Sequence, residues 1–293
     1  MIPVLLILSV LGGVIEAALR IFGGRDADPM EYPYVVRLGI KYSLNQLDAY
    51  FEHFQFLCTA SVLTPVWTLT AGHCVDDAVL TFLQSSYPTA SLKYVIMYGS
   101  ATAHRSTTDN FSDIVATVKH PSYNSMALQL GASGSNDVAL AKTTSTKLTK
   151  YAKLSAVEYP SLVGQAAIAV GYGITFEGDQ VDHTLQLGKT LQVLDVMIGT
   201  CAKDFRKNSL SPIICLSRLC SQPATILCRG DSGGPLLHDS GVVGINHMVE
   251  SDECTLRSAN SGLVKSSTVG INVPISPYVG WISNQIREKE ESH

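Results

Sequence analysis

The chain has no run of lysine or arginine, and charged residues make up only 16% of its 293 residues. A formal net charge of -4 likewise provides no positive surface for nucleic acid or for an anionic membrane. We therefore expect neither nucleic acid nor membrane among its partners. No repeat or low-complexity segment stands out, and 46% hydrophobic residues are enough for one large core or two small ones.

Long hydrophobic runs are also missing, because no apolar stretch reaches the roughly 20 residues of a membrane-spanning helix. Residues 1–15 are apolar without an ionisable side chain, and the small residues Ala17 and Ala18 follow. This pattern is typical of a secretory signal peptide, for which a membrane anchor is the alternative. We predict a signal peptide over residues 1–17 and a secreted, extracellular protein.

The cysteine count is odd. The seven cysteines are Cys58, Cys74, Cys201, Cys215, Cys220, Cys228 and Cys254. A secretory route places them in an oxidising compartment, where disulfides form. At least one thiol is then unpaired or intermolecular, and spacing alone does not determine the connectivity.

Short strand-like runs separated by glycine, proline, asparagine and serine predict an all-β protein. The candidate strands are residues 54–63, 66–70, 93–98, 114–118, 138–142, 165–170, 185–196, 234–237, 242–247 and 269–273. The polar stretch 143–153 is the candidate linker between two halves. One convincing helix follows Pro277, with Trp281, Ile282 and Ile286 on one apolar face, and we expect it to pack on the β-structure.

Three segments supply the groups that peptide hydrolysis requires: a nucleophile, a base, an acid that orients the base, and donors for the oxyanion. Residues 230–235 read Gly-Asp-Ser-Gly-Gly-Pro, a turn that can present Ser232 beside backbone amides. Residues 69–74 end a strand on His73, and residues 136–140 open one with Asp137. Taken singly, a glycine turn and a strand-capping aspartate are the more ordinary interpretations.

Together, in the order His, Asp, Ser, these segments resemble the trypsin and chymotrypsin (S1) family of serine proteases. Residues 21–24, 120–124 and 169–173 match as well, so the resemblance extends from Ile21 to the terminal helix. It implies two six-stranded antiparallel β-barrels, residues 21–145 and 146–293, the second ending in the helix. It also implies His73 as general base, Asp137 as orienting acid, Ser232 as nucleophile, and the amides of Gly230 and Ser232 as the oxyanion hole.

The resemblance further implies three disulfides, Cys58 with Cys74, Cys201 with Cys215, and Cys228 with Cys254. Cys220 is then left over, as a free thiol, a dimer bridge or a rival partner for Cys215.

Because Arg20 precedes Ile21, the resemblance implies a zymogen with a short propeptide over residues 18–20. In this family, cleavage after the basic residue frees an amino group, here on Ile21, which pairs inside the protein with the carboxylate of Asp231. A buried carboxylate without its partner costs about 3–5 kcal/mol, enough to hold the neighbouring oxyanion turn in another arrangement. We therefore predict that the uncleaved chain is inactive.

Ile226, six positions before Ser232, stands where the family has the floor of its specificity pocket. An apolar floor cannot balance a buried Lys or Arg, so we predict cleavage after apolar residues. Gly270 is expected to keep the opposite wall open. Such an enzyme would not cut after its own Arg20, which implies a basic-specific activating protease as a partner. The other implied partners are protein or peptide substrates and serpin-like or Kunitz-like inhibitors.

The chain departs from the family where Ser-Trp-Gly is usual, because it carries His247, Met248 and Val249. In one interpretation Val249 replaces the glycine and narrows the pocket entrance, as in elastases, and His247 lies near Asp137. In the other, extra residues before Cys254 shift the alignment and Met248 is simply core packing.

Two further predictions concern modification and metals. Residues 110–112 (Asn-Phe-Ser) satisfy the glycosylation rule and are expected in an exposed loop, with Asn110 as the acceptor. The histidines other than His73 and His247 show no metal-like spacing, and residues 100–108 lack the paired acids of the family's calcium loop. We predict no metal and no cofactor.

The rival function is a non-catalytic homologue that acts as a binding or regulatory module, which the same fold supports. A lipase or esterase is disfavoured by the order of the segments and by the β-only pattern.

Overall fold

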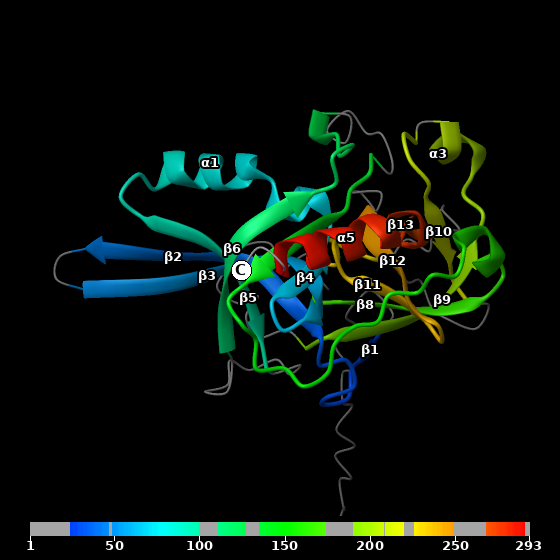
Figure 1. Ribbon diagram of the computed structural model, residues 1–293, viewed down its shortest axis with the longest axis horizontal. Coiled ribbons are helices and arrows are strands. Elements are labelled where there is room, and N and C mark those ends of the chain that lie inside the picture. Colours follow the sequence, from blue (N-terminus) through cyan, green and yellow to red (C-terminus); the bar gives the residue numbers. More distant parts are fainter. Residues whose placement is uncertain are drawn as a thin grey trace, which may run out of the picture.

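The computed structural model describes residues 24–46, 49–99, 110–126, 135–173, 190–207, 209–219, 226–248 and 268–290. The predicted signal peptide, the propeptide and Ile21 lie outside these ranges. The described chain forms two antiparallel sheets, each closed into a barrel, which confirms the all-β, two-barrel prediction (Figure 1).

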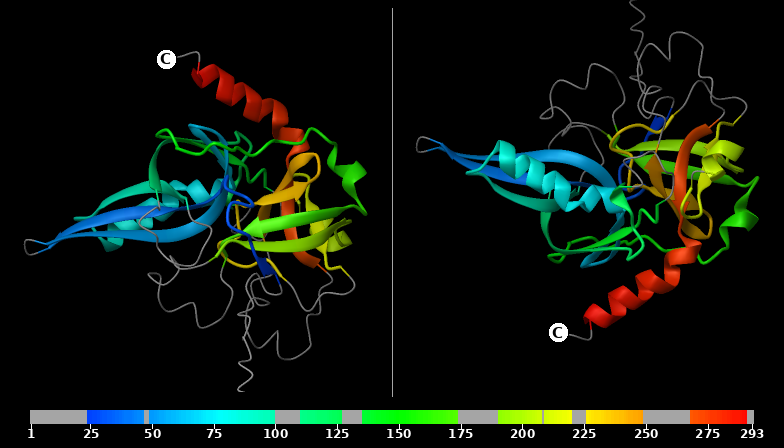
Figure 2. Two further views of the ribbon diagram at one scale, coloured as in Figure 1. Left: turned by 90° about the horizontal axis from the view of Figure 1, so that it is seen from below. Right: turned by 90° about the horizontal axis from the view of Figure 1, so that it is seen from above.

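The first barrel contains six strands in the closed order β2-β3-β4-β7-β6-β5. Their bounds are β2 Val35–Gln46, β3 Ala49–Thr64, β4 Trp67–Thr70, β5 Ser91–Tyr98, β6 Asn110–Lys119 and β7 Ala139–Thr143. The paired strands β2 and β3 extend beyond the barrel as a long hairpin, at the left of Figure 1 and again in both views of Figure 2.

The second barrel closes in the order β8-β9-β10-β13-β12-β11. Its bounds are β8 Ala166–Gly171, β9 Gln192–Gly199, β10 Ile214–Ser217, β11 Pro235–His238, β12 Gly241–Met248 and β13 Thr268–Pro274. The short strand β1 (Arg25–Asp26) adds to its β9 edge. Between the barrels, the connecting stretch leaves β7 at Thr143 and reaches a bridge between Leu154 and Val242.

Strands β1, β2 and β10 lie outside the predicted strand ranges, although the apolar residues of β2 alternate. Glycine weakens a strand prediction, and Gly39 lies in the middle of this one. The register shifts between Leu38 and Gly39, and a Cβ at Gly39 would overlap the carbonyl oxygen of Gln55. The shift skips Leu57 of β3, so the bulge lies in the partner strand opposite Gly39, and β2 itself continues through the glycine.

The expectation of a single convincing helix was wrong, because α1 (Asp77–Ser86) forms on the first barrel. Asp76 caps it by accepting a hydrogen bond from the amide of Ala78 at 3.3 Å. Val79, Leu80 and Leu83 pack against the core but stay only partly buried, and Phe82 is 70% exposed, so the apolar stripe of this short helix is narrow. A short helix, α3 (Lys203–Lys207), follows β9.

The predicted terminal helix is present as α5 (Val279–Glu290) and, although it follows the second barrel, it packs against the first. The ring of His120, just after β6, lies 5.1 Å from both the Tyr278 and the Trp281 rings. Tyr278 also donates a hydrogen bond to the side chain of Asn136 at 3.0 Å. The end of the chain therefore ties the two barrels together.

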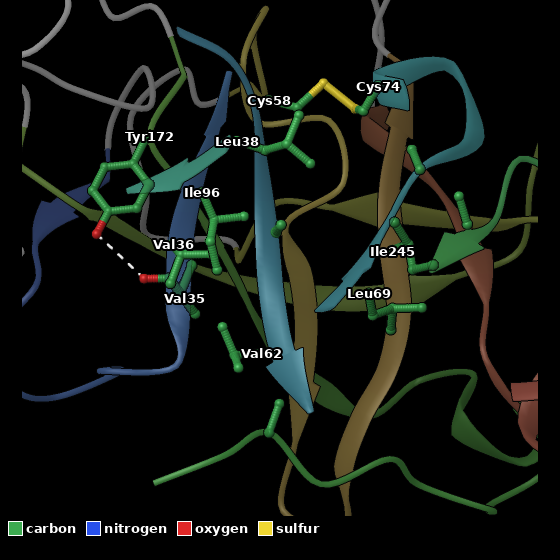
Figure 3. Close-up of a cluster of buried hydrophobic side chains, with 14 of the residues drawn as sticks. Val35, Val36, Leu38, Cys58, Val62, Leu69, Cys74, Ile96, Tyr172 and Ile245 are labelled. Atoms are coloured by element: carbon green, nitrogen blue, oxygen red, sulfur yellow. Dashed lines mark hydrogen bonds between the residues drawn. A yellow bond between two sulfur atoms is a disulfide. The ribbon is translucent and has the colours of Figure 1, made fainter. Parts of the chain in front are cut away.

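One continuous cluster of buried side chains spans the two barrels. It contains Leu38 and Ile96 from the first barrel together with Ile245 and Val273 from the second (Figure 3). A separate cluster, including Leu194, Leu216 and Leu236, fills the second barrel. Each fully buried aliphatic side chain contributes about 1.5–3 kcal/mol, so apolar packing holds the interface at which the site lies.

Asn110 lies at the first residue of β6 and is half-buried, so the expectation of an exposed loop was wrong. The reason is the next two residues. Phe111 packs against Phe54 with ring centroids 5.6 Å apart, and Ser112 is buried, which draws the segment into the sheet beside β5.

Candidate active site

His73 lies in the 3-10 turn Gly72–Val75, directly after β4. The disulfide between Cys74 and Cys58 of β3 anchors this turn to the barrel and confirms the first predicted pairing. A Cβ on Gly72 would lie 3.0 Å from the Oδ1 atom of Asp137. Glycine at that position therefore allows the acid to approach the backbone of the histidine turn.

Asp137 is fully buried just before β7. Ser135 and Asn136 precede it with φ values of 40° and 50°, a left-handed turn that reverses the chain. The Asn136 side chain secures the turn by donating to the carbonyl of Ser122 at 3.2 Å. As a result the carboxylate points at His73, whose amide donates to Oδ1 at 2.8 Å and whose Nδ1 lies 2.6 Å from Oδ2.

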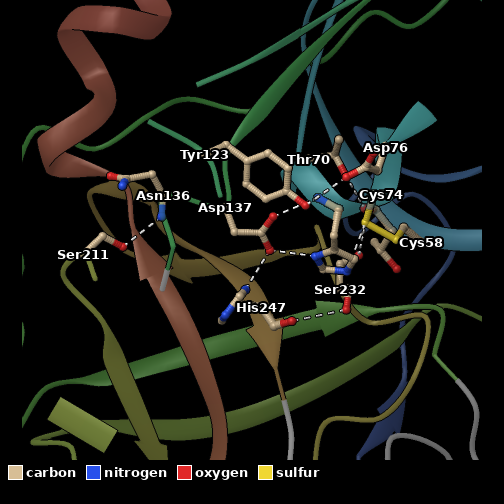
Figure 4. Close-up of polar contacts among 12 residues, drawn as sticks. Cys58, Thr70, Cys74, Asp76, Tyr123, Asn136, Asp137, Ser211, Ser232 and His247 are labelled. Carbon is tan, nitrogen blue, oxygen red and sulfur yellow. Dashed lines mark hydrogen bonds and ion pairs between the residues drawn. A yellow bond between two sulfur atoms is a disulfide. The ribbon is translucent and has the colours of Figure 1, made fainter. Parts of the chain in front are cut away.

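His247, on β12 of the second barrel, contacts the same carboxylate. Its Nδ1 lies 2.7 Å from Oδ2 of Asp137, and its side chain has no exposed surface. This agrees with the interpretation in which His247 lies near Asp137. Three N–H groups from two barrels thus converge on one carboxylate (Figure 4).

Ser232 lies on the glycine turn of the second barrel. Gly230 and Gly233 have φ values of 93° and 81°, and Gly233 donates to the carbonyl of Asn246 at 2.7 Å. The Ser232 carbonyl accepts a hydrogen bond from the Thr59 amide of the first barrel at 2.9 Å. The turn is therefore held by strands of both barrels.

The Ser232 hydroxyl and the His73 imidazole lie in the same site, but each has another neighbour. Oγ of Ser232 donates to the carbonyl of His247 at 3.4 Å, and Nε2 of His73 lies 3.7 Å from Sγ of Cys74 (Figure 4). Within the described residues, no hydrogen bond joins Oγ of Ser232 to Nε2 of His73.

The amides of Gly230 and Ser232, assigned above to an oxyanion hole, meet no acceptor among the residues that the structure describes. The turn that carries them is held by the first barrel, since Thr59 donates its hydroxyl to the carbonyl of Gly230 at 2.8 Å. The same hydroxyl accepts from the amide of Tyr172 at 3.0 Å. Thr59 was not among the predicted site residues, because no motif in the sequence distinguishes it from other strand threonines.

Asp231 is buried directly behind this turn. Its Oδ1 accepts from the amide of Gly173 at 2.7 Å and its Oδ2 from the amide of Cys228 at 2.8 Å. Side chains at Gly171 and Gly173 would overlap its carboxylate, which explains the glycines there. Arg20 and Ile21, with which activation was predicted to begin, lie outside the described residues.

Burial and mutual attraction oppose each other in the pKa values of the pair. Burial alone would lower the pKa of His73, but the charge and hydrogen bond of Asp137 more than offset it, so the pKa is raised above 6.5. Burial alone would raise the pKa of Asp137, but His73 and His247 together hold it well below its usual range. The acid is therefore a carboxylate at neutral pH.

Of the predicted pocket residues, Ile226 is buried and Gly270 faces Leu227, whose Cδ1 would lie 2.6 Å from a Cβ at Gly270. Val249 lies outside the described residues. Two polar residues that sequence analysis overlooked, Asn246 and Asn272, face each other on β12 and β13, buried and joined by a 2.7 Å hydrogen bond. Both asparagines interrupt apolar runs in the sequence, and this interruption could have identified them.

Cys201 and Cys215 are bonded as predicted, so Cys220 is not the partner of Cys215. Cys228 is also in a disulfide, whereas Cys254 and Cys220 both lie outside the described residues.

Within the described residues, two groups of side chains have the geometry of a metal site. In the group of Cys58, His73 and Cys74, both sulfurs are already joined in the disulfide and are not available as thiolates. The other group is His73, Asp137 and His247. In the part of the chain that the structure describes, no helix is long and apolar enough to cross a membrane.

Two closed barrels with a paired histidine and aspartate between them define the class of chymotrypsin-like folds, and comparisons with known proteins agree. The family model for trypsin matches residues 21–282. Alkaline trypsin C of Manduca sexta is 27% identical over 90% of this chain and 90% of its own length. Human granzyme M is 27% identical over 90% of this chain and 88% of its own length.

Among solved structures, neuropsin, a serine protease expressed in the limbic system of mouse brain, aligns with a TM-score of 0.63. The alignment covers 90% of this chain and 98% of neuropsin at 22% identity, so it bears on the fold alone. On the family match, the chain belongs to the trypsin family of serine proteases, peptidase family S1.

Proposed function

We propose that the chain is a secreted serine endopeptidase, made as a zymogen, that hydrolyses peptide bonds after apolar residues. One observation carries the proposal: Nδ1 of His73 lies 2.6 Å from a fully buried carboxylate, in the same site as Ser232 on its glycine turn. This pairing orients the imidazole with Nε2 facing away from the acid, and it stabilises the imidazolium that forms when His73 takes a proton.

In the proposed first step, the hydroxyl of Ser232 leaves the carbonyl of His247 and gives its proton to Nε2 of His73 while Oγ attacks the substrate carbonyl. His73 then gives the proton to the leaving amine, and water repeats the sequence on the acyl-enzyme. The amides of Gly230 and Ser232, without an acceptor within the described residues, are suited to receive the oxyanion. One such donor is worth about 3 kcal/mol of transition-state stabilisation.

Zymogen activation is part of the proposal. The buried carboxylate of Asp231 adjoins the oxyanion turn, so an incoming amino group on Ile21 would act on the arrangement of Ser232 directly. We expect a chain carrying Arg20→Gln to stay inactive after treatment with a basic-specific protease. Because Ile226 does not match a basic side chain, purified zymogen should not activate itself; rapid self-activation would contradict the apolar specificity.

Substrate preference is tested with a peptide library on the chain cleaved after Arg20. Apolar residues should be enriched on the amino side of the cut bond. Preference for Lys or Arg at that position would show that Ile226 does not form the pocket floor.

The main test is labelling by an organophosphonate, which bonds to an activated serine. Labelling of the cleaved chain at Ser232, absent from a Ser232→Ala variant of equal stability, supports the endopeptidase. The second candidate, a non-catalytic binding or regulatory module, is favoured by the hydrogen bond of the Ser232 hydroxyl to His247 in place of His73. An intact, cleaved chain that does not label supports the module.

A further inference from the structure

His247 gives this site an arrangement of three donors that a metal ion can use. Oδ2 of Asp137 lies 2.6 Å from Nδ1 of His73 and 2.7 Å from Nδ1 of His247. One ligand atom from each of the three residues lies within 4.8 Å of the other two. Both imidazole nitrogens therefore point at a single oxygen, one from each barrel.

We propose that a divalent transition-metal ion of the zinc type binds between His73, Asp137 and His247. Two histidines and one carboxylate are the protein ligands of several zinc sites, with a fourth position left for water. Imidazole nitrogens favour zinc, copper and nickel, whereas calcium and magnesium prefer oxygen ligands, so the donor set excludes the latter two.

The surroundings of the cluster favour such a site. Oδ1 of Asp137 is held by the backbone amide of His73 at 2.8 Å, which leaves Oδ2 for the ion and fixes the carboxylate as outer-shell partners do in metal sites. The side chains of Asp137 and His247 have no exposed surface, while that of His73 is 28% exposed. The ion would therefore enter beside His73.

The required movement is small. With bonds of about 2.0–2.1 Å to nitrogen and oxygen, tetrahedral ligands stand about 3.3 Å apart. The two nitrogen–oxygen distances must therefore open by roughly 0.6 Å each. A rotation of the partly exposed His73 ring can open the distance from its Nδ1 to Oδ2. A small rotation of the Asp137 carboxylate that keeps Oδ1 near the His73 amide can open the distance from Oδ2 to Nδ1 of His247.

Metal binding rearranges protons in a defined way. Without metal, each neutral imidazole carries its hydrogen on Nδ1 and donates it to Oδ2. The ion takes the Nδ1 lone pairs, and each hydrogen moves to Nε2, so neutral imidazoles release no net proton. His73 then presents an N–H at Nε2 and cannot accept the proton of Ser232. The bound ion is thus a reversible inhibitor, a consequence that rests on the proposed function, whereas the binding does not.

The test measures Zn²⁺ binding to the full purified chain by calorimetry, before and after cleavage following Arg20. We expect one equivalent to bind, and His247→Ser to weaken affinity about 100-fold or more, since even losing an outer-shell partner costs 10–100-fold. The matched control is His238→Asn, which removes a partly buried histidine bonded to Ser240 and Gln165 and should leave the affinity unchanged. Equal binding by His247→Ser and wild type, or no binding by wild type, would overturn the site.

A spectroscopic measurement needs no variant and covers the case in which His247→Ser does not fold. Pulsed EPR of the Cu²⁺-loaded wild-type chain reports how many imidazoles bind the ion: two support the site, and one or none overturns it. Organophosphonate labelling at Ser232 separates the two proposals. If two imidazoles hold the copper but the chain never labels, only the proposed function is overturned. If the chain labels, Zn²⁺ does not block the labelling, and the two-imidazole copper signal is missing, only the metal site is overturned.

Discussion

The two barrels contribute to the site in different ways. From the first barrel come His73 and Asp137, held by short charged contacts, a disulfide and a polar turn at Asn136. From the second comes Ser232, held by backbone hydrogen bonds and glycine conformations that side chains rarely adopt. The first half is thus fixed by electrostatics in a buried setting and the second by backbone geometry. Substitutions in the first half should therefore change the catalytic rate, and those in the second the free energy of unfolding.

The largest expected effect tests the electrostatic half. Asp137→Asn keeps the shape of the side chain but removes its charge and favours the wrong tautomer of His73. In triads of this kind the change lowers kcat by about 10⁴-fold. Peptide hydrolysis by the cleaved variant measures it, with Asp113→Asn as control, because Asp113 forms a surface ion pair with exposed Lys93. A loss below tenfold at Asp137 would contradict the assigned role.

The backbone half is tested by Gly233→Ala against Gly164→Ala. Both glycines have similar left-handed φ values, 81° and 86°, but a Cβ at Gly233 would overlap Thr59 and Thr70, whereas one at Gly164 meets nothing within 4 Å. Left-handed strain alone costs about 1–2 kcal/mol, and overpacking adds about 1–3 kcal/mol. Denaturant unfolding should therefore show Gly233→Ala losing clearly more stability; equal losses would show that the turn relaxes freely.

The two disulfides sharpen the comparison because their loops are similar, with sequence separations of 16 and 14. Removing either pair, by Cys58→Ser with Cys74→Ser or by Cys201→Ser with Cys215→Ser, should cost about 3 kcal/mol of unfolding free energy. The kcat of the two double variants should differ. Sγ of Cys74 lies 3.7 Å from Nε2 of His73, so only loss of the first pair should lower kcat in protein that remains folded.

The smallest effect is a shift of the pH profile. His73 must be neutral to act as base and its pKa is raised, so the acid limb of kcat/KM should lie above pH 6.5. By linkage, the charged pair stabilises the fold fully below pH 6.5 and loses this contribution as pH rises through the raised pKa. Removing the charge of Asp137 should move the limb downward; an unmoved limb would mean that another group controls it.

Much of the fold could be predicted from local pattern. The alternating strands and the helix after Pro277 were found because each carries its own periodic signal. Strand β2 was missed at Gly39, which lies opposite a bulge in the partner strand β3. Helix α1 was missed because it is short and its apolar residues are only partly buried. Asn110 was misplaced because its environment depends on Phe54, which is distant in the sequence.

The sequence by itself determined the family, the all-β class, the order of the three catalytic candidates and the pairing of Cys58 with Cys74, because these depend on residue identity at short, recognisable spacings. Tertiary structure decided which groups share the carboxylate of Asp137, since His247 approaches it from the other barrel across 110 positions of sequence. It likewise decided that Thr59 anchors the oxyanion turn. Contacts between chain segments that meet only after both barrels close leave no periodic trace in either segment.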